Sequence, residues 1–501
     1  MIRVPNTPPA SEVTMAGPAA PATTETGLRR NAIGLREVAF QSITDMAPGA
    51  AIAASIPAGA AFAGGSLPLS VLLALIASLF CAWSIGLLAR EMPSAGSLAT
   101  YAARGLHPSI GFLVAWGYAL VGLLIPPLVL LQLGFTTAGT LNAEFSGYPA
   151  NLWWPWSLAG AVIVLAAGYY GIRTSTRLGT VLGLFEIGVF VVLAVFLIVH
   201  AGSHNTFSVF GTSYTPSGYK GISGVIAGSV YTVLAFGGLE GAAPLAEEAR
   251  NPRKTIQRAV LLATLLIGAL YVFTTYAVDV AYGPGKFAAF AAESGNASWE
   301  GLARSLYGLF WFFVFLAIVN STIANANAGM NVSSRTAYAM GRIGAFPRLL
   351  AQVHPRHRSP HLAILTAFVV TVAVTLGLGL GYDPTEAFFM VGTGLVIILA
   401  AIYILMNAAC IGFFARKGGL KPLQHVLIPV LGIATFIPAW LTAAGIKAFS
   451  FVAPLSAPVS YMGPAVGIWM VLGVIYLVYL YRTSPERITQ VGLVHLDDEP
   501  A

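Results

Sequence analysis

Long apolar stretches, separated by short polar connections, follow one another along almost the whole chain, from about Val38 to Tyr481. A helix that crosses a bilayer needs roughly 20 predominantly apolar residues. The pattern predicts about twelve such helices, among them residues 67–88, 178–200 and 361–381. Little sequence remains for a soluble domain, so we expect an all-α polytopic membrane protein.

Two of these apolar stretches are interrupted. Residues 231–244 (YTVLAFGGLEGAAP) contain three glycines, a carboxylate at Glu240 and a proline, and residues 45–51 (DMAPGAA) interrupt the first predicted span. Irregular backbone survives at membrane depth only where it faces protein or a water-filled cavity. Interrupted spans at matching places of two halves are typical of secondary transporters, whose substrate binds at the breaks. The first and sixth spans are therefore both expected to be discontinuous, as an inverted repeat of five plus five helices would require.

Composition agrees with a membrane protein. Charged residues make up only 9% of the chain and hydrophobic residues 57%, with a mean hydropathy of +0.78. Soluble globular domains contain about 25% charged residues. Cys81 and Cys410 both lie inside apolar stretches, which argues against a disulfide framework or a metal cluster. The sequence contains neither a P-loop lysine motif nor an embedded nucleophile triad, so we expect no cofactor and no enzymatic activity.

The basic residues are distributed by side of the membrane. With the spans numbered in order and the N-terminus inside, all 26 lysines and arginines fall on the cytoplasmic side except Lys220, Lys286, Arg304 and Lys447. This bias follows the positive-inside rule. We therefore expect both termini in the cytoplasm and the chain in the cell membrane. The net charge of +7 reflects this topology and does not indicate a nucleic-acid partner.

Three predicted cytoplasmic stretches carry motifs. Residues 91–96 (EMPSAG), followed by Tyr101 and Arg104, come after the second span. Residues 246–256 (AEEARNPRKTI) come after the sixth span, and residues 334–342 (SRTAYAMGR) after the eighth. In this order and topology, the three motifs resemble those of the amino acid–polyamine–organocation permeases. The likeness covers nearly the whole chain.

The resemblance implies two inverted five-helix repeats plus two peripheral C-terminal helices. It also implies that substrate binds at the two breaks, often with coupling to protons. The domain organisation that follows is residues 1–35 as a disordered cytoplasmic tail, 36–202 and 203–414 as the two repeats, 415–482 as the peripheral helices and 483–501 as a cytoplasmic tail.

The two breaks supply the main candidate site. Free backbone N–H groups and the positive ends of half-helices would attract a substrate carboxylate, and unwound carbonyls would suit its ammonium group. The glycines have a simpler alternative explanation, which is close packing of helices. The candidate substrate-binding residues at the breaks are Ala47, Pro48, Gly49, Ala50 and Ala51 in the first span and Phe236, Gly237, Gly238 and Glu240 in the sixth.

Glu240 and Glu186 are candidates for proton coupling, because burial disfavours the charged form of a carboxyl group. Glu240 either binds the substrate's ammonium group or carries the proton, and capping of loose backbone amides is the structural alternative. The resemblance supports a functional role, since arginine/agmatine and putrescine members have a carboxylate at the matching place. Glu186 stands where many proton-coupled members have a lysine. It takes the proton itself, helps to hold a cation, pairs with an internal base, or is a structural carboxylate.

Asn325 and Asn327 of the eighth span are expected to line the cavity, because isolated amides that face lipid are costly. Hydrogen bonding between helices is the alternative. Through the resemblance, Pro126 matches a substrate-facing segment of the third span. Phe236 is a candidate aromatic lid, although the family's usual gating aromatic aligns with Leu234.

Two further acids are not assigned to the substrate site. Asp45 is expected to cap a helix N-terminus, with an inner gate formed with a cytoplasmic arginine as the alternative. Asp279 lies near the outer end of the seventh span, where its side chain is expected to reach the outer interface.

The sequence thus favours a secondary active transporter that imports an amino acid by alternating access, coupled to protons rather than to sodium. An amine or polyamine uniporter, symporter or antiporter is the alternative, favoured by two membrane carboxylates without a clear buried cation. An embedded enzyme would need a catalytic cluster at one interface, and the sequence contains none. Paired helix breaks favour alternating access over a passive channel.

Overall fold

The computed structural model describes residues 33–490, apart from residues 95, 146, 171–175, 248, 292–297, 343, 345 and 358. The predicted N-terminal tail therefore lies outside the described residues except for its last three, and so do residues 491–501 of the C-terminal tail. Within the described part, the regular elements are all helices, and one isolated bridge joins Ile33 to Ala249. The predicted all-α fold class is confirmed.

Ten described segments are long and apolar enough to cross a membrane. The first, Leu35–Glu91, has 57 residues and contains both the broken first span and the straight helix α5 (Leu67–Glu91). Helix α8 (Trp154–Tyr170) is apolar and has 17 residues, enough for about 25 Å of helix. The first segment contains two crossings, which meet at Leu67, and α8 is a further one. With these two additions, the ten segments give the twelve predicted crossings.

The remaining long helices follow the predicted spans closely, except for the eighth. In the eighth span, Gly308, with φ +57°, separates the short α12 (Trp299–Tyr307) from the long α13 (Phe310–Arg342). The other long helices are α7 (Pro108–Glu144), α9 (Thr176–Ala201), α10 (Ile222–Leu234), α11 (Pro252–Tyr282), α14 (His361–Gly381), α15 (Pro384–Lys417), α16 (Ile428–Ala444) and α17 (Met462–Thr483).

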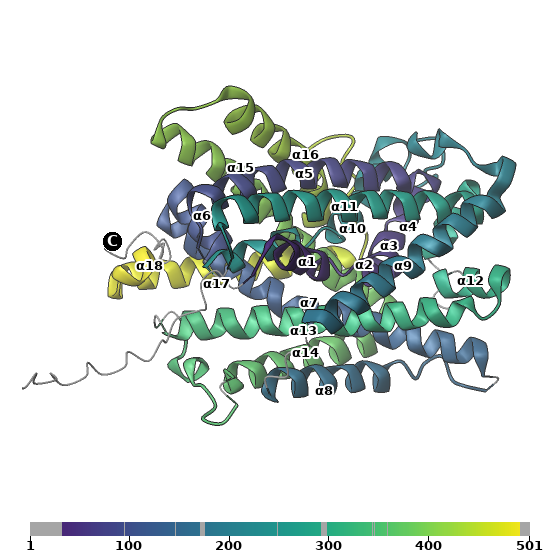
Figure 1. Ribbon diagram of the computed structural model, residues 1–501, viewed down its shortest axis with the longest axis horizontal. Helices are drawn as coiled ribbons and strands as arrows, with labels where there is room; N and C mark the ends of the chain where they lie inside the picture. The colour runs from purple at the N-terminus through teal and green to yellow at the C-terminus, as the bar shows by residue number, and fades with distance from the viewer. Residues whose placement is uncertain are drawn as a thin grey trace, which may run out of the picture.

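Helices at corresponding places of the two predicted halves pack against each other. Helix α5 packs along α11, α7 along α13, and α8 along α14. Figure 1 shows the short helices α1 (Leu35–Asp45), α2 (Pro48–Ala50) and α10 in the middle, between α5, α11 and α15 on one side and α13, α14 and α8 on the other. The broken spans therefore lie in the interior, where their backbone is shielded from lipid.

Both predicted breaks are confirmed. Helix α1 ends at Asp45, Ala47 takes a left-handed conformation with φ +45°, and Pro48 begins α2. Helical structure then continues as far as Ser66. A proline suits the first position of a helix because its missing N–H has no intrahelical partner there.

In the sixth span, α10 ends at Leu234, Gly238 has φ +102°, and a 3₁₀ helix covers Leu239–Glu247. Residues with a side chain rarely adopt such a φ, so glycine is required at position 238.

The positive-inside bias predicts which end of the bundle faces the cytoplasm. His204 follows the fifth span at its predicted outer end, and Arg356 lies in the predicted cytoplasmic segment between the eighth and ninth spans; both residues are exposed. The native Cys81 and Cys410 are buried, so they should give little background labelling. In intact cells, we expect a membrane-impermeant maleimide to label His204→Cys. Arg356→Cys should react only after permeabilisation. Equal reactivity of the two variants in detergent is the control, and the reverse pattern in cells would overturn the proposed orientation.

Candidate functional site

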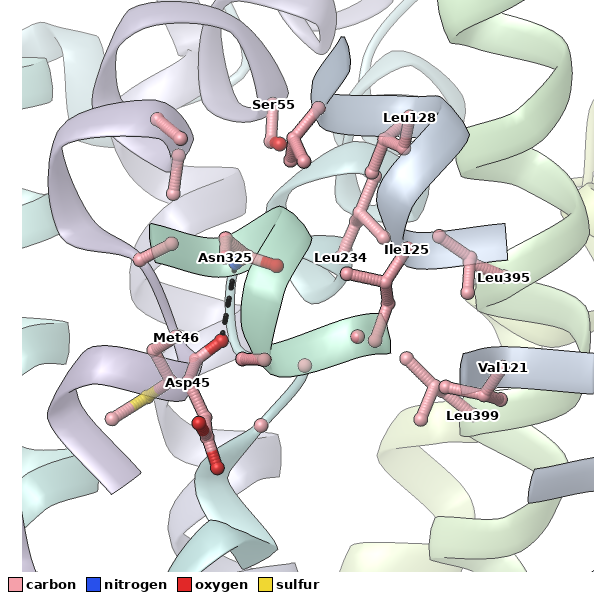
Figure 2. Close-up of a pocket in the computed structure, with 18 of the residues that line it drawn as sticks. Asp45, Met46, Ser55, Val121, Ile125, Leu128, Leu234, Asn325, Leu395 and Leu399 are labelled. Carbon is pink, nitrogen blue, oxygen red and sulfur yellow. Dashed lines mark hydrogen bonds between the residues drawn. The ribbon is translucent and has the colours of Figure 1, made fainter. Parts of the chain in front are cut away.

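A cavity lies where the two broken spans meet. It encloses about 700 Å³ of empty space, counting its open mouth. Its walls come from the ends of α1 and α2, the end of α10 with the following 3₁₀ helix, and the facing sides of α7, α13 and α15. In Figure 2, Asp45 and Met46 lie on one side, Val121, Leu395 and Leu399 on the other, and Asn325 between them.

Glu240 is held by two tyrosines at the edge of this cavity. Its side chain is 1% exposed. The hydroxyl of Tyr118 on α7 donates to Oε1 at 3.0 Å, and the hydroxyl of Tyr403 on α15 donates to Oε2 at 2.8 Å. The backbone N–H groups of Gly238 and of Glu240 itself also interact with the carboxylate. Both oxygens therefore accept hydrogen bonds, an arrangement that stabilises a buried carboxylate.

Asp45 is the second acid of the cavity wall. It is the last residue of α1, so the expected role as an N-terminal cap is wrong. Its Oδ1 accepts from Gln41 Nε2 at 2.9 Å, and its main-chain oxygen accepts from Asn325 Nδ2 at 3.3 Å (Figure 2). An anion at the C-terminal end of a helix meets the negative end of the helix dipole, which is unfavourable. The position of Asp45 therefore favours a cation nearby.

Close contact between the two broken spans explains two of the glycines. Ser42 Oγ on α1 donates to the carbonyl of Leu239 at 3.0 Å and accepts from the N–H of Ala242 at 2.9 Å. A Cβ atom at Gly238 would lie 2.6 Å from the carbonyl carbon of Asp45, and one at Gly241 would collide with Oδ2 of Asp45. The packing explanation therefore holds at positions 238 and 241.

Carbonyl groups released by the first break are satisfied by side chains from three other helices. Tyr271 OH donates to the carbonyl of Met46 at 3.0 Å. Gln132 Nε2 donates to that of Ala50 at 3.0 Å, and Trp299 Nε1 to that of Ile52 at 2.8 Å. Of these three residues, only Ala50 belongs to the set predicted to bind substrate. The two carboxylates can carry a full negative charge, which a carbonyl cannot, so they are the stronger cation ligands of the cavity.

Glu186 lies behind the first break, outside the cavity wall. It is 5% exposed and accepts a hydrogen bond from Asn320 Nδ2 at 3.0 Å. The backbone N–H of Gly49, in the first turn after the break, also interacts with its carboxylate. The negative charge of Glu186 therefore offsets the positive end of the half-helix that begins at Pro48.

The rest of the cavity wall is largely apolar. Val121, Ile125 and Leu128 follow one another along α7, and Leu395 and Leu399 face them from α15. Ser55 and Asn325 are the polar residues of the wall apart from the two acids and Tyr118. The described wall contains no lysine, arginine or histidine.

The structure brings together seven of the twelve residues predicted to bind substrate. The residues that line the cavity are Ala47, Ala50, Ala51, Gly237, Gly238, Glu240 and Asn325. Pro48, Gly49, Pro126 and Asn327 are not among the described lining residues. Phe236 is fully buried against Tyr271, at 5.4 Å between ring centroids, so it does not cover the cavity, whereas Leu234 lines it.

Sequence reasoning did not identify Tyr118 and Tyr403. Both lie inside apolar spans without a local motif, and only packing of α7 and α15 beside the sixth span brings their hydroxyls to Glu240. Asp45 was noticed but assigned to capping. Its place in the interrupted segment 45–51 was the signal available from the sequence.

Asp279 does not reach the outer interface as expected. Its side chain is fully buried on α11, and neither carboxyl oxygen has a hydrogen-bond partner among the described residues. It is also not one of the described residues of the cavity wall. Asp279 therefore offers a buried acid remote from the cavity against which variants of the site can be compared.

Comparison with known proteins finds similar sequences over most of this chain. A family model described as "Amino acid permease" matches residues 33–480. The chain is 26% identical over 439 residues to the low-affinity putrescine importer PlaP of Escherichia coli (strain K12), covering 85% of this chain and 88% of the relative. It is 26% identical over 393 residues to the branched-chain amino acid permease BcaP of Bacillus subtilis (strain 168), covering 74% and 80%.

A eukaryotic relative is also similar. Cationic amino acid transporter 4 of Mus musculus is 26% identical over 368 residues, which cover 69% of this chain and 54% of the relative. These relatives are named for putrescine, branched-chain amino acids and cationic amino acids. The relatives therefore agree on transport of amino acids or amines and differ in the solute.

The close approach of Gly241 to Asp45 can be tested. Gly241→Ala places a methyl group on the Asp45 carboxylate. Overpacking of this kind costs about 1–3 kcal/mol, so we expect transport to fall by about fivefold to 150-fold if this cost falls on the transporting state. Gly377→Ala is the control, because an added Cβ there meets no atom within 4 Å. Initial rates of uptake in cells measure both, and an unimpaired Gly241→Ala variant would contradict the geometry.

Proposed function

Because this chain belongs to the amino acid permease family, we propose that it is a secondary active transporter that imports a solute with a protonated amino group. It is a multi-pass membrane protein that transports amino acids or amines and is not an enzyme. The proposal adds import across the cytoplasmic membrane, coupling to protons and alternating access. An amino acid was the first expectation, and an amine is the second candidate.

The observation that carries the proposal is the acid pair in the cavity at the two breaks. Asp45 and Glu240 both line it, and the described wall offers no basic side chain to balance them. Burial of an unpaired charge is costly, so such carboxylates take a proton or bind a cation. A substrate ammonium group and a coupling proton are the two positive partners that a transport cycle supplies.

Glu240 is the proposed proton carrier. Its two tyrosine partners come from α7 and α15, whereas Glu240 itself follows the break in the sixth span. Protonation removes the charge that both hydroxyls stabilise, so it weakens these ties between the broken span and its neighbours. The proton thereby biases the position of the broken span, as alternating access requires. Glu186 is the second candidate carrier, through its contact with the first break.

A cluster of aromatic rings joins spans that also contribute residues to the cavity wall. Phe62 stacks on Tyr231 at 5.7 Å between centroids and contacts Tyr219 edge-on at 5.1 Å. Phe389 contacts Tyr231 at 5.3 Å. These rings come from the first, sixth and tenth spans and one connecting segment, so separation of the spans would open them. This arrangement supports alternating access through the cavity.

Acidification of the outer side should drive uptake. In proteoliposomes supplied with a panel of amino acids and amines, we expect at least one solute to accumulate when the outside is more acidic. One proton per solute supports about tenfold accumulation per pH unit, because each unit is worth about 1.4 kcal/mol. Protein-free liposomes and a protonophore are the controls. Sodium dependence without any response to pH would exclude proton coupling.

Replacement of Glu240 should abolish proton-coupled accumulation without preventing the protein from folding. Glu240→Gln keeps an oxygen that accepts a tyrosine hydrogen bond but cannot exchange a proton. We expect the variant to fold, to exchange solute across the membrane and to lose accumulation. Glu186→Gln is measured in parallel, with Asp279→Asn as a buried-acid control. Accumulation that persists in Glu240→Gln but is lost in Glu186→Gln would assign the proton to Glu186 instead.

A further inference from the structure

Resting on the transport function proposed above, we infer that the solute is a primary amine with one ammonium group, an apolar body and no carboxylate. Of the two candidate solute classes, amino acids and amines, this selects amines, and it further limits them to amines with one positive charge. Three features of the cavity carry it: the order of its polar and apolar residues, its lack of basic side chains, and the engagement of its donors.

The cavity has an acidic end and an apolar end. Along α7, Tyr118 comes first, followed outward by Val121, Ile125 and Leu128. Helix α15 runs in the opposite direction, from the outer to the inner side. Leu395 therefore lies outward of Leu399, and Tyr403 is the innermost of the three. Because Tyr118 and Tyr403 both donate to Glu240, the acid lies at the inner end of the two rows. A bound solute therefore meets charge at one end and hydrocarbon along the rest.

An ammonium group fits the acidic end. Oδ2 of Asp45 faces Gly241, the residue after Glu240, so the two carboxylates belong to one small region. The carbonyl groups at the C-terminal end of α1 add negative potential there. One bound ammonium group would compensate this region, and its N–H donors match carboxylate acceptors.

A carboxylate finds no comparable place. The first turn after the break at Ala47 already faces the carboxylate of Glu186 through the N–H of Gly49. Asn325 contributes the one side-chain amide of the described wall, and one of its N–H groups already donates to the carbonyl of Asp45. A zwitterionic amino acid would bring its negative group among three acids, which raises the electrostatic cost of binding.

A second ammonium group is equally disfavoured. At the apolar end the described wall is formed by Ile125, Leu128, Leu234 and Leu395, with the hydroxyl of Ser55 as its polar group. One hydroxyl cannot replace the hydration of a full charge. A diamine would therefore have to leave its second charge in an apolar environment, whereas an alkyl or arylalkyl chain gains from burial there.

Matched pairs of amines and amino acids test the inference. We propose calorimetric titration of the purified full-length protein in nanodiscs with 3-methylbutylamine and leucine, 2-phenylethylamine and phenylalanine, and cadaverine and lysine. Binding is measured because neutral amines cross lipid without a carrier. We expect the two monoamines to bind about tenfold or more tighter than their amino acids, a difference of about 1.4 kcal/mol or more. Cadaverine should bind more weakly than either monoamine.

Each other outcome is decisive. Amino acids that bind as tightly as their amines would overturn the exclusion of a carboxylate, and a diamine that binds more tightly than the monoamines would overturn the single charge. Absence of binding by all six probes would overturn the inference as a whole. After any of these three outcomes, acid-driven uptake of another solute in the proteoliposome experiment would still support the proposed transport function.

Two variants connect the result to the named residues. Asp45→Asn should weaken monoamine binding about tenfold, because it removes one of the two charges. Glu186→Gln should narrow the preference for amine over amino acid about threefold or more, since it restores positive potential at the half-helix end. Asp279→Asn should change neither quantity. Thermal unfolding of each variant checks that it folds, and an unchanged preference in folded Glu186→Gln would contradict its electrostatic role.

Discussion

Backbone groups at the two helix breaks must be satisfied inside a bilayer, and the rest of the structure is built around this constraint. In the first span, the carbonyls of Asp45, Met46, Ala50 and Ile52 each accept a hydrogen bond from a side chain of another helix. These donors come from α7, α11, α12 and α13, so the break requires its neighbours to be in place. The broken spans therefore lie in the centre of the bundle.

The same breaks concentrate negative charge. Asp45 ends α1, Glu240 follows the second break, and Glu186 faces the first turn of the half-helix from behind. The described cavity wall provides no base, so the electrostatic balance depends on what enters from solution. A protein that depends on an incoming cation in this way is suited to bind and release one, which is the basis of the transport that we propose.

Hydrogen bonds to Glu240 also connect charge to movement. The two tyrosine hydroxyls belong to α7 and α15, which pack against each other, and both act on one carboxylate of the broken sixth span. A change in the charge of this single group therefore alters two contacts at once. In the mechanism that we propose, packed interfaces of this kind switch between discrete arrangements, and proton transfer to Glu240 biases the position of the half-helix.

Sequence alone determined the class of the protein. Span lengths, the two breaks and the side bias of basic residues depend on local patterns that the bilayer imposes, so they can be read without coordinates. Tertiary structure decided the site. Phe236 and Leu234 are two residues apart on a helical turn, so they point in nearly opposite directions, and only tertiary packing decided that one packs on Tyr271 and the other lines the cavity. Tyr118, Tyr403 and the role of Asp45 followed only from contacts between helices that are distant in sequence.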